Sequence, residues 1–174
     1  MNKALKIFFT ASFLLYILLL FYVLFLRGRG NVYSQSLPLS EYMLSAVNLT
    51  PFETIKGFWR ALQENRINTD IALLNIFGNV ALFVPFGFLL PVNAPRLRAL
   101  WKCAAVSAAA ILAAEVLQLL FKVGSFDVDD IILNLSGVLI GYILYKAAYF
   151  IYKKLRFANG KQHILKTIKH PPCS

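Results

Sequence analysis

Four long apolar runs divide the chain, and shorter polar segments separate them. The runs cover residues 5–26, 71–92, 99–121 and 131–152. Each is long enough to cross about 30 Å of hydrocarbon as an α-helix, which rises about 1.5 Å per residue. The pattern predicts an all-α membrane protein with four transmembrane helices.

Lys3 and Lys6 stand at the start of the first run, where a secretory signal peptide also carries basic residues. However, the run is longer than the roughly 7–15 residues of a signal-peptide core, and no small-residue cleavage pattern follows it. We therefore interpret residues 1–26 as a retained transmembrane anchor. Three further parts complete the predicted organisation: an outer loop (27–70), a three-helix part of the membrane domain (71–152) and a basic tail (153–174).

One amphipathic helix is predicted within the outer loop, over about residues 51–66. It begins with a capping box, in which Thr50 is the N-cap, Pro51 the first helical residue and Glu53 the third. An apolar stripe follows one side of this helix: Phe52, Ile55, Trp59 and Leu62. We expect the helix to lie in the outer membrane interface. The alternative is that its stripe packs on the other helices.

Composition supports the membrane interpretation. Apolar residues make up 59% of the chain and the mean hydropathy is +0.64, whereas soluble domains are about 45–50% apolar. The net charge is +10, but the charges flank the apolar runs instead of gathering on one soluble domain. A nucleic-acid partner is therefore not expected, and membrane lipids are.

The lysines and arginines indicate the orientation of the spans. Bases without acids follow the second and fourth spans, whereas the turn after the third contains Lys122 with Asp127, Asp129 and Asp130. Because basic flanks stay in the cytoplasm, both termini are expected inside and the acidic turn outside. Arg27 and Arg29 oppose this orientation, since they follow the first span on its outer side.

Few residues are available for cysteine, histidine or metal chemistry. Cys103 and Cys173 both fall on the cytoplasmic side in this orientation, so no disulfide is expected. His163 and His170 lie in the tail, which excludes a histidine base or zinc ligand at the outer face. The acidic turn lacks the glycine and distal glutamate of a calcium loop. No cofactor is expected. A Mg²⁺ or Ca²⁺ site built from Glu115 and the aspartates remains an alternative.

Small residues and prolines inside the spans predict close helix packing. Pro85 in the second span cannot donate a hydrogen bond to the carbonyl of Ala81, which predicts a kink near mid-membrane. Gly137 and Gly141 in the fourth span form a small-xxx-small pair, a pattern typical of tightly packed membrane helices.

The strongly polar residues inside the spans, apart from Lys146, lie in the outer halves of their helices, at about 1.5 Å per residue. With two aspartates of the turn they form a candidate ligand-binding pocket: Asn79, Glu115, Gln118, Asp127, Asp130 and Asn134. Simpler roles stay open. The aspartates can cap the fourth helix, the amides can join helices, and Glu115 can be protonated or paired with Lys122.

Several of these segments together resemble the VanZ-like family. The resemblance is carried by residues 48–52 (Asn-Leu-Thr-Pro-Phe), by 79–87, and by the polar residues Glu115, Gln118, Asp127, Asp130 and Asn134. Its motif positions also include Thr50, Pro51, Pro85, Gly87 and Gly137. The resemblance covers residues 48–145. It implies a multipass protein of the cytoplasmic membrane of a Gram-positive bacterium, associated with reduced susceptibility to teicoplanin-type lipoglycopeptides. It supplies no catalytic residues.

The leading hypothesis is a non-enzymatic protein that engages a lipidated antibiotic or a lipid-linked cell-wall precursor at the outer face. The first alternative is an enzyme that modifies cell-wall precursor lipids, with Glu115 and the aspartates as acid–base or metal-binding groups. The second is a small exporter with Glu115 as a relay, although the polar residues do not continue inward except at Lys146. The sequence does not indicate the oligomeric state.

Overall fold

The computed structural model describes residues 3–27, 36–64 and 69–169, with side chains described over 3–27, 36–64 and 73–157. Helices dominate these residues. In chain order the elements are α1 (Lys3–Phe21), the π-helical turn η1 (Tyr22–Leu26), α3 (Leu39–Ala46), β1 (Val47–Asn48), α4 (Glu53–Gln63), α5 (Thr69–Asn93), the 3-10 turn η2 (Pro95–Leu97), α6 (Leu100–Leu120), β2 (Phe126–Asp127) and α7 (Val128–Lys169).

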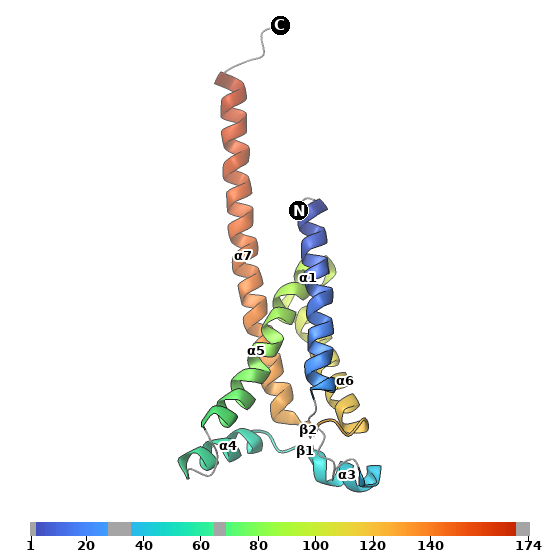
Figure 1. The fold of residues 1–174 in the computed structure, drawn as a ribbon. Coiled ribbons are helices and arrows are strands. Elements are labelled where there is room, and N and C mark those ends of the chain that lie inside the picture. The colour runs from blue at the N-terminus through green and yellow to red at the C-terminus, as the bar shows by residue number, and fades with distance from the viewer. Residues whose placement is uncertain (1–2, 28–35, 65–68, 170–174) are drawn as a thin grey trace.

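Four of the described helical segments are long and apolar enough to cross a membrane: Lys3–Leu26, Leu73–Asn93, Leu100–Leu120 and Val128–Phe157. They confirm the predicted fold class. Figure 1 shows the start of α1 and the end of α7 at one end of the molecule, and α3, α4 and both strands at the other. We call this second end the cap and define it as residues 36–64 and 121–127.

The closest helix packing joins α5 to α7, and glycines make it possible. A Cβ atom added to Gly87, Gly137 or Gly141 would lie 2.0–2.1 Å from a backbone carbonyl oxygen of the facing helix. A side chain at these positions would therefore push the two backbones apart. We call these three residues the glycine seam. The sequence indicated the packing role of Gly137 and Gly141, and the structure identifies α5 as the helix they face.

Pro85 lies inside α5, which continues through it to Asn93. Its missing N–H weakens the preceding turn, whose carbonyl at Ala81 loses its helical partner. In that same turn the Tyr16 hydroxyl of α1 donates a 2.8 Å hydrogen bond to the carbonyl oxygen of Leu82. A neighbouring helix thus supplies a donor one residue from the carbonyl that the proline leaves without its helical partner.

Replacing Tyr16 with phenylalanine should lower the free energy of unfolding by about 1 kcal/mol, since the Leu82 carbonyl would lose a donor away from water. Thermal unfolding in mild detergent measures the change. Tyr22→Phe is the matched control, because the Tyr22 side chain is exposed and its hydroxyl has solvent or lipid headgroups to bond. Equal unfolding temperatures for the two variants would contradict the proposed support of the turn.

The structure contains elements that the sequence did not predict, and it shifts the bounds of two helices that were predicted. Helix α3 and the β1–β2 pair were not predicted. Helix α4 begins at Glu53 and ends at Gln63, inside the predicted range of 51–66. Helix α7 continues past residue 152 to Lys169, so much of the segment predicted as a basic tail is helical, with 170–174 outside the described residues.

Candidate functional site

A short parallel strand pair holds the cap together. Val47 pairs with Phe126, and Asn48 pairs with Asp127. The pairing places the Asn-Leu-Thr-Pro-Phe segment directly beside the acidic turn, although the two are far apart in the sequence. Two motifs that carry the family resemblance therefore meet at one place in the structure.

Asp127 is the centre of this meeting point. It lies directly before α7, and its carboxylate accepts a 2.8 Å hydrogen bond from the N–H of Asp129, as an N-cap residue does. The same carboxylate accepts a bond from the Thr54 hydroxyl at 2.5 Å and from the Asn48 amide at 3.4 Å. Asp127 thus caps its own helix and also connects it to β1 and α4.

Asp129 connects α7 to the start of α4. One carboxylate oxygen accepts the N–H of Phe52 at 2.5 Å, and the other accepts the N–H of Ile55 at 3.0 Å. The side chain is fully buried. Because the first N–H groups of a helix have no partners within it, a carboxylate placed there both bonds them and complements the helix dipole. Asp129 therefore acts as the N-cap group of α4, supplied by another helix.

This arrangement corrects the predicted capping box. The residue at the N-cap position of α4 is Phe52, which has a positive φ of 65° and forms no side-chain cap. Thr50 instead donates its backbone N–H to the Asn48 side chain. A charged acceptor bonds backbone N–H groups more strongly than a threonine hydroxyl, which explains why the distant Asp129 takes the position. We call Asp127, Asp129, Asn48 and Thr54 the carboxylate clamp.

Asp130, the third aspartate of the turn, contacts a different helix. Its carboxylate accepts a hydrogen bond from the amide of Asn79 on α5. Asn79 is buried, and Asp130 is half-buried. The pair ties the outer part of α5 to the start of α7, and it lies beyond the glycine seam along the same two helices.

The remaining predicted site residues are buried between helices. Glu115, Gln118 and Asn134 are each 4% exposed. The Gln118 amide donates a 2.9 Å hydrogen bond to the carbonyl oxygen of Leu24 in η1, which joins α6 to the first span. Within the described residues, the Asn134 side-chain oxygen accepts no hydrogen bond. The structure places the six predicted residues toward the cap ends of their helices, and the hydrogen bonds of Asp127, Asp130 and Gln118 join three different parts of the chain to one another. Whether the six form one ligand-binding pocket stays a prediction.

Two anchors of the cap were not predicted from the sequence. The Tyr42 hydroxyl of α3 donates a 2.9 Å hydrogen bond to the Gly124 carbonyl, and the Lys122 ammonium donates one of 2.5 Å to the Leu37 carbonyl. Burial raises the pKa of the Tyr42 phenol. Neither residue belongs to a recognisable motif, and no local pattern in the sequence indicated either contact.

Metal and cysteine chemistry finds little support in the described residues. Within them, no three side chains of histidine, cysteine, aspartate or glutamate lie close enough to hold a metal ion. Cys103 is buried in α6 and forms no disulfide. His170, Cys173 and the side chain of His163 lie outside the described part of the chain.

Four long apolar helices with a structured cap at one end define a polytopic membrane protein. The family model described as VanZ/LLP1 matches residues 13–151, and the chain belongs to this family. It is similar to Protein VanZ of Enterococcus faecium, with 31% identity over 131 residues, which are 75% of this chain and 69% of that relative. No solved structure matches the chain. The match confirms the resemblance seen in the motifs and extends it into α1.

Proposed function

We propose that this VanZ/LLP1 protein acts at the outer face of the cytoplasmic membrane. There it lowers susceptibility to teicoplanin-type lipoglycopeptides by engaging a lipidated or lipid-linked ligand. Family membership supports the class of function. The cap supports the proposed location of that function at the outer face of the membrane. A lipoglycopeptide arrives from outside and puts its acyl chain into the outer leaflet, so a protein that engages it needs a structured surface at that interface.

The carboxylate clamp is the observation that carries the proposal. Two buried carboxylates are costly unless hydrogen bonds compensate them, and here they bond α4 and residues 48–55 to the start of α7. The cap that they help to hold together exposes large apolar side chains: Leu44, Leu49, Phe52 and Trp59. Exposed apolar side chains on a fixed cap suit an amphipathic partner at a membrane interface. In this proposal the buried polar residues position the surface that meets the ligand.

The orientation is part of the proposal. Arg96, Arg98 and Lys102 lie in or beside the connection between α5 and α6, and this connection lies toward the end of the molecule opposite the cap (Figure 1). Arg98 there donates to the Pro91 carbonyl and lies 5.5 Å from the Tyr149 ring centroid. Basic flanks favour the cytoplasmic side, which supports the proposed orientation with both termini inside and the cap outside.

Expression in a susceptible Gram-positive host should raise the inhibitory concentration of teicoplanin more than that of vancomycin, which lacks the acyl chain. The expected difference arises because the proposed surface meets the lipidated part of the drug. Membrane abundance is measured by immunoblot in the same cultures. An equal rise for both drugs, or no rise at normal abundance, would exclude the proposed function for this protein.

A further inference from the structure

Acidic and basic side chains are separated between the two ends of the molecule. All eight Asp and Glu residues lie within 41–64, at 70 or within 115–130, in the cap or in the cap-side parts of α5, α6 and α7. The residues 71–114 and 131–174 contain lysines and arginines but no Asp or Glu. The cations toward the end opposite the cap therefore have no carboxylate side chain beside them, and their counterions must come from outside the protein.

Arg98 lies at the membrane boundary of this end. The span in α5 ends at Asn93 and the span in α6 begins at Leu100, so the connection between them lies where hydrocarbon gives way to lipid headgroups. Trp101 is 70% exposed, and the Lys102 ammonium lies 5.2 Å from its ring centroid. Exposed tryptophan beside basic residues is typical of this boundary. An anion bound to Arg98 would thus lie at headgroup depth.

The structure holds Arg98 in place by three contacts. Its guanidinium carbon lies 5.5 Å from the Tyr149 ring centroid, within the range of a cation–π interaction. Its Nε donates a 3.4 Å hydrogen bond to the Pro91 carbonyl oxygen, and its own carbonyl oxygen accepts one of 2.8 Å from the Tyr142 hydroxyl. The side chain is nonetheless exposed. A guanidinium held in this way can present its terminal N–H groups to an anion.

The face of α7 that meets Arg98 carries two further cations. A row of tyrosine rings follows this face, with successive centroids 6.0 Å apart: Tyr142, Tyr145 and Tyr149. The Lys146 ammonium lies 5.5 Å from the first of these rings. Lys153 follows the last of them by four residues, which places it on the same face one turn further along. Both lysines are exposed, so three cations border one row of rings.

We infer that Arg98, Lys146 and Lys153 bind the phosphate of an anionic phospholipid in the leaflet at this end, which is the cytoplasmic leaflet in the proposed orientation. The planar guanidinium can donate two parallel hydrogen bonds to phosphate oxygens, and the lysines add positive charge. A lipid already presents its phosphate at this depth, whereas a soluble phosphate would have to leave bulk water. The site is at the opposite end from the cap, so the inference does not depend on the proposed function.

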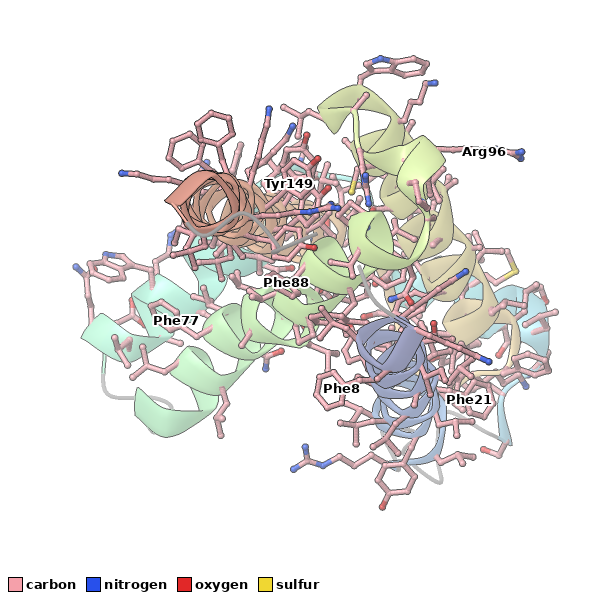
Figure 2. The ribbon with its side chains drawn as sticks, turned by 90° about the horizontal axis from the view of Figure 1, so that it is seen from above. Phe8, Phe21, Phe77, Phe88, Arg96 and Tyr149 are labelled. Carbon is pink, nitrogen blue, oxygen red and sulfur yellow. The ribbon has the colours of Figure 1, made fainter. Side chains whose placement is uncertain are left out.

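A specific site differs from the general attraction between a basic flank and anionic lipids. That attraction depends on the number of cations near the surface, whereas a headgroup site depends on which cations they are. Arg96 is exposed and two residues from Arg98, and Figure 2 shows it directed away from α7 and Tyr149. Lys154 is exposed beside Lys153, but it lies about 100° further around the helix. These two residues are the matched controls.

Native mass spectrometry of the full-length protein in a neutral detergent tests the inference, because a neutral micelle has no charged surface to attract cations in general. Phosphatidylglycerol and phosphatidylcholine are added in equal amounts, and the bound fractions give the relative affinity for the first lipid. We expect the wild type to prefer phosphatidylglycerol about tenfold, since the choline cation of the other lipid is repelled by the site. Equal binding of the two lipids would overturn the inference.

Arg98→Gln should abolish most of this preference, and Lys153→Gln should reduce it, whereas Arg96→Gln and Lys154→Gln should retain it. The Tyr142 hydrogen bond goes to the backbone of Arg98 and survives the substitution, and Lys153 lies on an exposed part of α7, so folding is not at risk in the second variant. Equal losses within each pair would overturn the site and leave only a basic flank. Displacement of the lipid by excess glycerol 3-phosphate would overturn the assignment to a lipid.

Discussion

Alanine at Gly141 is expected to lower the free energy of unfolding by about 3 kcal/mol, at the upper end of the usual cost of overpacking. The added methyl group would lie 2.0 Å from the Val84 carbonyl oxygen and 2.9 Å from the Phe88 nitrogen. Both are backbone atoms of α5, so no side chain can rotate away to make room. The two helices must separate, and contact along the glycine seam is lost.

Gly78→Ala is the matched control for this substitution. It makes the same chemical change in α5, but its methyl group meets no atom within 4 Å. Because alanine favours the helix over glycine by up to about 1 kcal/mol, this variant should be neutral or slightly stabilised. Thermal unfolding in mild detergent compares the two. A Gly141→Ala protein that unfolds at the wild-type temperature would show that the seam is looser than the structure indicates.

The elements that the sequence predicted correctly are those with a local signal. The four spans were predicted from continuous apolar runs, and α4 from its amphipathic stripe, because each pattern lies within one segment. The strands β1 and β2 have two residues each, too few to show any alternation. Helix α3 is likewise short, and Tyr42, which anchors it, contacts Gly124 across 82 positions of sequence.

The candidate site was predicted only in part for the same reason. A shared depth for Asn79, Glu115, Gln118 and Asn134 could be inferred from positions along each helix, but the partner of each side chain could not. Thr50-Pro51-Phe52-Glu53 has the local composition of a capping box, yet the group that caps α4 is 77 residues from Phe52. A local pattern describes which group a helix end needs, and only the tertiary fold decides which residue supplies it.

Asp129→Asn is expected to release the start of α4 from α7, at a cost of about 2–3 kcal/mol, because a charged acceptor is lost and a buried donor is left facing backbone N–H groups. Asparagine has one acceptor oxygen in its side chain, so it can bond Phe52 or Ile55 but not both. Its NH₂ group would face the other N–H. Hydrogen–deuterium exchange of the peptide covering residues 50–63 measures the release as faster exchange in α4.

Glu53→Gln provides the control for Asp129→Asn. It makes the same carboxylate-to-amide change in the first turn of the same helix, but the Glu53 side chain is exposed, so the expected cost is below about 1 kcal/mol. At equal membrane abundance, Asp129→Asn should also lose teicoplanin tolerance while Glu53→Gln retains it, because the start of α4 would no longer be held to α7. If Asp129→Asn exchanges as slowly as the wild type, then the carboxylate does not hold α4. If it exchanges faster but keeps full tolerance, then the position of α4 does not determine how the ligand is engaged.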